Sequence, residues 1–215
     1  MPTPCVARLL AFLVFFSSFC ATAAEAEGKD PQLVFFFDAD GRRVPVELDK
    51  AFSPQLLGTA KAATLRLEPH REFAYGGLRF RFPREYSFEA ELGSPVLSMW
   101  TLTGNDCTLM IHRYRNQANA EELQQGVVEQ MLTAYKDARK KSGPARLELQ
   151  GETLRGTRLE VELASTRIFQ DIFAIRSGKD VVMLIIQDSP KADAAVSAER
   201  LATVKLLKES LKLPK

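Results

Sequence analysis

The fold of this chain is decided by the run Val181-Val182-Met183-Leu184-Ile185-Ile186, in which every residue is apolar. Successive side chains of a β-strand point to opposite faces, so a run that is apolar at every position predicts a strand that is buried on both faces. We therefore expect residues 181–186 to form a central strand of a β-sheet with an apolar layer on each side.

The residues on either side of this run extend the prediction. Before it, Ser177-Gly178-Lys179 predicts a tight turn from a preceding strand at about 167–176. After it, Ser189 and Pro190 predict the cap and the first turn of a C-terminal helix. The central strand is thus expected to lead directly into a helix.

Further strands and one more helix are predicted upstream. The helix begins at Asn119, which forms a capping box with Glu122, and it ends at Ser142-Gly143-Pro144. Alternating apolar residues predict the other strands, at about 78–82, 86–91, 96–103, 107–115, 147–149 and 157–163. This order of elements predicts an α+β fold, in which an antiparallel β-sheet is sandwiched by helices.

The first 23 residues have the pattern of a signal peptide. Arg8 is followed by the apolar run 9–16 and then by Ala21-Thr22-Ala23, which is a small-residue cleavage signal. We expect an exported protein, periplasmic or extracellular after cleavage near Ala23. The apolar run is shorter than the ~20 residues that a spanning helix needs, and no later segment is as long, so the mature chain is expected to have no transmembrane segment. An uncleaved membrane anchor is the alternative.

The rest of the chain divides into an N-terminal extension, residues 24–72, and a main domain, residues 73–215. The extension begins with the polar segment Glu25–Asp30, which is expected to be flexible. A β-hairpin follows, with strands at 33–37 and 42–48. The hairpin and the linker after it are predicted to be an appendage of the main domain.

Charge and motifs exclude several classes of function. Lys and Arg number 29 and Asp and Glu number 27, which argues against a nucleic-acid-binding protein. The sequence has no Walker loop, no zinc-protease motif, no nucleophile elbow and no dinucleotide-binding glycine motif. The turn Asp38-Ala39-Asp40-Gly41 lacks the glutamate that completes a calcium loop. We expect a non-enzymatic protein without catalytic residues, metal ion or cofactor.

One cysteine and one histidine lie close together in a predicted strand. Cleavage near Ala23 would leave Cys107 as the only thiol, and we expect it to be buried; an intermolecular disulfide is the alternative. His112 follows five residues later, and this odd spacing places the two side chains on opposite faces of the strand. A Cys-His dyad is therefore not expected. Glu160 and Glu162 share one strand face, which we interpret as solvated surface rather than an acid-base pair.

Arginine and aromatic residues near two strands predict one binding surface. Guanidinium groups beside aromatic rings suit anionic ligands and the centres of protein interfaces. The candidate residues are Arg79, Arg81, Arg84, Trp100, Arg113, Tyr114 and Arg115. An envelope protein or an anionic ligand is the expected partner. The alternative is a wet sheet face on which these arginines pair with nearby glutamates.

Four segments carry a resemblance to a known family. They are Tyr75-Gly76-Gly77-Leu78-Arg79-Phe80-Arg81-Phe82-Pro83, residues 152–161, the hairpin around Gly178 with residues 181–190, and Leu206-Leu207-Lys208-Glu209-Ser210-Leu211. Over residues 73–213 the chain resembles the PsbP-like and Mog-type α/β/α sandwich, including the bacterial DcrB-like envelope proteins. The shared features are turn glycines and core positions, so the resemblance implies an architecture more than an activity.

The resemblance implies a role as an accessory or binding protein, because the known members of that fold include extrinsic lumenal subunits and a nuclear GTPase-binding protein. No binding residue of the family is matched in this chain. Together with the leader, it predicts an exported, non-enzymatic accessory or binding protein of the cell envelope. Two alternatives stay open: a small-ligand-binding sandwich with a pocket between helix and sheet, and a hydrolase with a dispersed site.

Overall fold

The computed structural model describes residues 27–46, 62–117, 119–136, 138–149, 151–163, 166–191 and 195–214, together with residues 51, 53, 55 and 58. Within them the chain forms twelve β-strands and two α-helices. The predicted signal peptide lies outside these residues, as does the end of the predicted strand 42–48.

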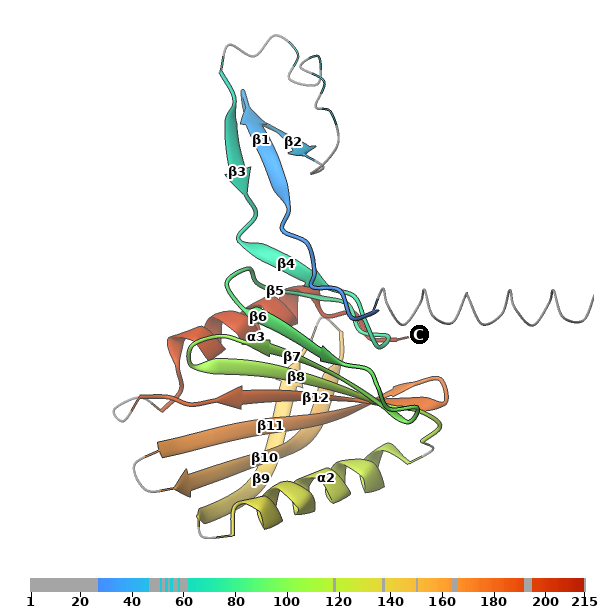
Figure 1. Cartoon of the computed structure of the whole chain (residues 1–215). Helices are drawn as coiled ribbons and strands as arrows, with labels where there is room; N and C mark the ends of the chain where they lie inside the picture. Colours follow the sequence, from blue (N-terminus) through green and yellow to red (C-terminus); the bar gives the residue numbers. More distant parts are fainter. Residues whose placement is uncertain are drawn as a thin grey trace, which may run out of the picture.

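A seven-stranded antiparallel sheet forms the body of the molecule, in the order β6-β7-β8-β12-β11-β10-β9 (Figure 1). Its strands are β6 (Ser87–Glu91), β7 (Leu97–Thr103), β8 (Cys107–Tyr114), β9 (Arg139–Glu148), β10 (Thr153–Leu163), β11 (Thr166–Ser177) and β12 (Asp180–Asp188). β12 lies in the middle of the sheet, between β8 and β11. The prediction of a central strand at residues 181–186 is confirmed.

Each face of β12 belongs to a different apolar core. Val182, Leu184 and Ile186 point into the larger core, and Val181, Met183 and Ile185 point into the smaller one. All six residues are at most 1% exposed. The uninterrupted apolar run thus arises because both faces of this strand are covered.

One helix packs on each side of the sheet. The helix α2 (Ala120–Ala134) lies on the smaller core, and we name this side of the sheet the α2 face. The helix α3 (Ala198–Ser210) lies on the larger core, and we name this side the α3 face. A two-stranded sheet of β4 (His70–Phe73) and β5 (Phe80–Pro83) shares the α3 face, and α3 packs mainly on β5.

The predicted helix-sandwiched α+β fold is wrong, because strand makes up 51% of the structure and helix only 18%. α2 ends at Ala134, and the residues predicted to finish that helix form the edge strand β9 instead. Pro144 is tolerated there because the outward side of an edge strand needs no N–H donor. Strands β4 and β5 cover part of the α3 face in place of a helix. The chain therefore has a β-rich antiparallel fold.

The two helices differ in how well the sequence predicted their starts. Asn119 caps α2 as predicted, since its side chain accepts hydrogen bonds from the backbone N–H groups of Glu121 and Glu122 at 3.2 Å. α3 does not start at Pro190. It begins at Ala198 after the N-cap Ser197, whose side chain accepts from the N–H of Arg200.

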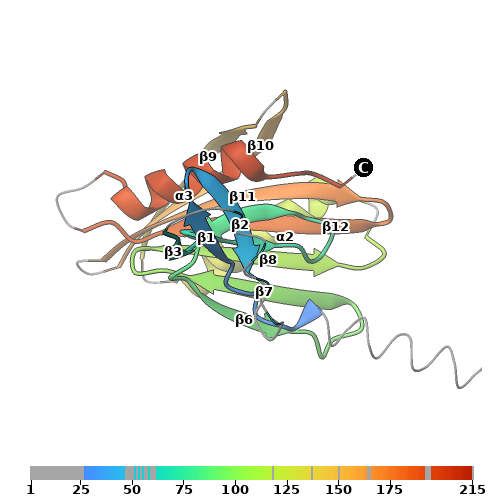
Figure 2. The same cartoon turned by 90° about the horizontal axis from the view of Figure 1, so that it is seen from above.

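The N-terminal extension forms a second, three-stranded sheet in the order β2-β1-β3. The strands β1 (Phe35–Ala39) and β2 (Arg42–Val46) form the predicted hairpin, and β3 (Thr64–Leu67) pairs with the other side of β1. We name this sheet the arm. Figure 1 shows the arm standing off the seven-stranded sheet beyond β4, and Figure 2 looks down on it from above.

Candidate functional site

The predicted arginine and aromatic surface is not assembled as one patch. Trp100 is fully buried in the core of the α3 face. Arg113 lies on the same face and donates from Nε to a carboxylate oxygen of Asp180 at 2.8 Å. Tyr114 points to the opposite side and packs in the core under α2. The sheet itself therefore separates Tyr114 from the other candidates.

Each of the remaining four arginines has a partner within the chain. The pairs are Arg79 with Glu72, Arg81 with Glu209, Arg84 with Glu85, and Arg115 with Ser98. These partners lie on different elements, so the arginines do not converge. The structure therefore favours the alternative interpretation, in which most of these arginines pair locally.

The chain's own N-terminal segment, residues 27–31, covers the region around Trp100. The indole Nε1 of Trp100 donates to the backbone carbonyl of Glu27 at 2.8 Å, and the Tyr75 hydroxyl donates to that of Lys29 at 2.7 Å. Arg113 adds an ion pair with Glu27 at 3.5 Å. The prediction that this polar segment is flexible is wrong for its described part, because side chains of the main domain hold its backbone.

Arg71 of β4 also binds the N-terminal segment. Its side chain is buried, and it donates from Nη1 to Asp30 at 2.6 Å and to the carbonyl of Pro31 at 3.2 Å. Nη2 donates to the carbonyl of Tyr86, and the guanidinium lies 4.9 Å from the ring centre of Phe82. A buried guanidinium needs such partners to offset its desolvation. The segment and the main domain therefore stabilise each other.

A buried charge network joins β10, β11 and α3. Asp171 is 3% exposed and accepts two hydrogen bonds from Arg158, at 2.6 and 2.7 Å. Arg200 of α3 donates to the same carboxylate. Sequence reasoning missed this network, although one signal was present: Asp171 is the single acid within the predicted strand 167–176.

A second buried acid holds the start of α3. Asp188 is fully buried and accepts from the backbone N–H and the hydroxyl of Ser197, at 3.2 and 2.5 Å. Ser197 Oγ also accepts from the N–H of Arg200 at 3.0 Å. The two histidines lie elsewhere, His70 on β4 and His112 on β8. This hydroxyl serves as a helix cap, and neither histidine lies beside it to form a Ser-His pair.

Cys107 and His112 lie on opposite faces, as predicted. Cys107 is 1% exposed in the core of the α3 face, and burial raises the pKa of its thiol to about 11. His112 lies on the α2 face with its ring centre 6.3 Å from that of Tyr114. Burial lowers the pKa of His112, so its imidazole is neutral at physiological pH.

The opening that best fits a binding site lies where β10 leaves β11. The pairing of the two strands ends at Gly156, opposite Phe173, but β11 runs on to Ser177 while β10 continues with β9 alone. At Gly156 a Cβ atom would lie 2.1 Å from the carbonyl oxygen of Ile172. Only glycine permits this close approach, so Gly156 marks the point where the sheet splits.

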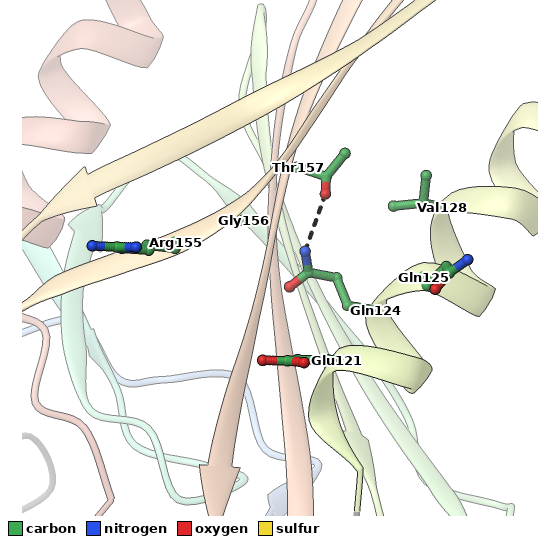
Figure 3. A pocket seen from close by; sticks show the side chains of 7 residues that line it. All are labelled: Glu121, Gln124, Gln125, Val128, Arg155, Gly156 and Thr157. Atoms are coloured by element: carbon green, nitrogen blue, oxygen red, sulfur yellow. Dashed lines mark hydrogen bonds between the residues drawn. The ribbon is translucent and has the colours of Figure 1, made fainter.

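A polar groove of about 420 Å³ fills the angle between α2 and β10 (Figure 3). Its lining residues are Glu121, Gln124, Gln125, Val128, Arg155, Gly156 and Thr157. Figure 3 shows Gln124 reaching from α2 to Thr157, and the hydrogen bond between them is 3.1 Å long. Gln124 Oε1 also accepts from the backbone N–H of Ala174 at 3.2 Å. The Gln124 side chain thus accepts the hydrogen bond that a neighbouring strand would otherwise accept from Ala174.

Residues 174–177 of β11 form an unpaired strand edge, which we name the β11 edge. Backbone groups alternate between the two sides of a strand, so the N–H and C=O of Ala174 and of Arg176 all point away from β12. Among the described residues, only the Ala174 N–H has a partner on that side. One N–H and two C=O groups therefore remain open to an added strand.

Positive charge surrounds the β11 edge. Arg155 lines the groove of Figure 3, while Arg176 and Lys179 line a second groove of about 360 Å³ at the end of β11. All three side chains are exposed, and none has an ion pair within the described part of the chain. Glu121 is the acid at this site, whereas Asp180 is engaged with Arg113. An acidic ligand would complement this surface.

No protein-family model matches the chain, and a search of curated proteins finds no match. The family resemblance seen in the sequence stays a prediction, and the helix-sandwiched fold that it implied is not the fold observed. Among the described residues, no helix has the length and apolar character to cross a membrane. Function must therefore be inferred from the geometry of this chain.

Proposed function

We propose that this chain is an exported, non-enzymatic binding protein of the cell envelope, and that it binds an extended segment of a partner protein as an added strand at the β11 edge. The observation that carries the proposal is the end of β11, residues 174–177, which has no pairing with β10 because that pairing stops at Gly156 and Phe173. Unpaired N–H and C=O groups at a strand edge are a template for another chain.

The groove beside this edge supports the choice of an extended segment. Alternate side chains of an added strand would point toward α2, into the groove lined by Gln124, Gln125 and Arg155. The uncompensated charges of Arg155, Arg176 and Lys179 favour acidic residues in that segment. Polar side chains in the groove would supply specificity, while the backbone of β11 would supply most of the affinity.

The test uses a fluorescent synthetic peptide in which glutamate alternates with valine or threonine. Binding to the full chain is expected to raise the anisotropy of the peptide and to weaken with salt, because exposed charges attract it. Methylation of the peptide's amide nitrogens along one edge should abolish binding, whereas methylation along the opposite edge should leave it intact. Equal effects of the two methylation patterns would rule out strand addition.

A matched pair of charge reversals tests the location. Arg176→Glu at the β11 edge should strongly weaken peptide binding. Arg146→Glu, an exposed arginine on the edge strand β9, should not. Equal loss in both variants would show that net charge rather than the β11 edge is responsible. Export is tested separately by mass spectrometry of the protein from an envelope fraction, which should begin at Ala24.

A further inference from the structure

Every methionine after Met1 faces the same side of the sheet as His112. The chain has five methionines, of which Met110, Met131 and Met183 belong to the core of the α2 face. Met99 alternates with the buried Trp100 on β7, so it also points to the α2 face. Four thioether side chains from three strands and one helix thus share one face with one imidazole.

Three of these residues form a row across neighbouring strands. His112 on β8 is the direct register partner of Met99 on β7 and of Met183 on β12. Directly opposed residues of antiparallel strands have Cβ atoms about 4.5–5.5 Å apart, within reach of flexible side chains. Met110 lies two residues before His112 on β8, so it stands next to the row on the same face.

His112 is free to act as a ligand. Among the described residues, neither of its ring nitrogens makes a hydrogen bond to the protein, and the ring centre of Tyr114 lies 6.3 Å from its own. Among those residues no carboxylate is paired with it either. A ring nitrogen of an imidazole offers a lone pair to a metal ion.

We propose that Met99, His112 and Met183, with Met110 beside them, form a binding site for a soft monovalent metal ion, Cu(I). Thioether sulfur is a soft ligand that selects Cu(I), and imidazole also binds copper. The thioether donors carry no charge, which suits a singly charged ion better than Zn²⁺ or Cu²⁺. Within the described residues no group of three or more His, Cys, Asp or Glu side chains is placed to hold a metal, so hard or borderline ions have no comparable site.

Packing in the core accounts for only one member of the row. Methionine fills irregular gaps in apolar cores, which explains the fully buried Met183. Met99 and His112 are only half-buried and are register partners, so this end of the row is open to an ion from solvent.

The test titrates the full chain with Cu(I) alone, without oxygen, against a chromophoric Cu(I) chelator. Cys5→Ser, Cys20→Ser and Cys107→Ala are present throughout, so that no thiol contributes. The expected result is one Cu(I) ion per chain, with sulfur and nitrogen neighbours in X-ray absorption. Zn²⁺ should not compete. Failure to take Cu(I) from the chelator, or preference for Zn²⁺, would overturn the proposal.

The ligands are assigned with variants that keep the packing. Met99→Leu with Met183→Leu preserves side-chain volume, and His112→Asn preserves a polar side chain. Each is expected to lower Cu(I) affinity by more than the ~10–100-fold that changes outside a metal's direct ligands cause. His70→Asn on β4 is the matched control and should bind normally. Circular dichroism confirms that each variant is folded, and unchanged affinity in the folded variants would contradict the site.

Discussion

The indole Nε1 of Trp100 donates a hydrogen bond to the backbone carbonyl of Glu27, with nitrogen and oxygen 2.8 Å apart. This contact joins the buried aromatic core of the α3 face to the N-terminal segment 27–31. The side chain that sequence reasoning placed on an exposed binding surface is therefore covered by another part of the same chain. Binding to a partner must use a different surface, which is why the β11 edge becomes the leading candidate.

Trp100→Phe should weaken the attachment of the N-terminal segment. The change removes the Nε1 donor to the Glu27 carbonyl and part of a fully buried ring, so we expect the free energy of unfolding to fall by about 2–3 kcal/mol. Trypsin should also cleave faster after Lys29. Tyr75→Phe is the milder control, because it removes one hydrogen bond, worth about 1 kcal/mol. Unchanged cleavage in Trp100→Phe would show that the segment is held by other contacts.

Gly156→Ala should be strongly destabilising, because the new Cβ would lie 2.1 Å from the Ile172 carbonyl oxygen. We expect a loss of about 2 kcal/mol or more in urea unfolding, since a backbone atom cannot move aside as a side chain can. Gly143→Ala on the neighbouring strand β9 is the matched control. Its Cβ would meet no atom within 4 Å, so its stability should stay the same or rise by up to ~1 kcal/mol. Equal stabilities of the two variants would contradict the split of the sheet at Gly156.

Sequence patterns predicted the local elements better than the layers. The uninterrupted apolar run at residues 181–186 identified the central strand, because burial on both faces leaves a direct trace in composition. Gly143-Pro144 predicts the end of a helix, but the same residues also suit an edge strand. Only pairing with β10 decides between helix and strand here. Which strands pair with each other cannot be predicted from the residue pattern of one sequence.

The candidate sites show the same limit. The separation of β10 from β11 depends on a close approach between Gly156 and Ile172, which lie on two different strands. Likewise, Met99, His112 and Met183 become neighbours only through the register of three strands. Cys107 and His112 were correctly separated because both lie on one strand, where alternation is enough. Sites within one element can be predicted from spacing, whereas sites across elements need the register.

Asp171→Asn should destabilise the protein by about 3–5 kcal/mol, because it leaves the buried Arg200 without a charged partner. The loss can be measured by urea unfolding at neutral pH. Asp38→Asn is the control for a pair near solvent, since Asp38 Oδ2 lies 3.5 Å from Arg66 Nε and the two side chains are 41% and 59% exposed. Its effect should stay below ~1 kcal/mol. A similarly small loss for Asp171→Asn would mean that Arg200 finds another partner.

Cys107 should react slowly with thiol reagents while the protein is folded. Burial raises the pKa of its thiol to about 11, so little thiolate is present at pH 8, and the sulfur is also shielded from solvent. With Cys5 and Cys20 replaced by serine, a colorimetric disulfide reagent should modify the native chain far more slowly than the chain in urea. Rapid modification of Cys107 in the folded protein would show that the thiol is accessible, and would favour the alternative that it forms an intermolecular disulfide.

His112 should make stability depend on pH near neutrality. Burial lowers its pKa in the folded state below the ordinary value of 6.5, so the unfolded chain binds a proton more readily. The contribution of this group to the free energy of unfolding is therefore complete above pH 6.5, and it is lost as the pH falls toward the lower pKa of the folded state. We expect the urea midpoint to decrease between pH 7.5 and pH 5.0. His112→Leu should remove part of that decrease and His70→Gln should retain it. If His112→Leu keeps the full decrease, the imidazole is not the group that makes stability depend on pH.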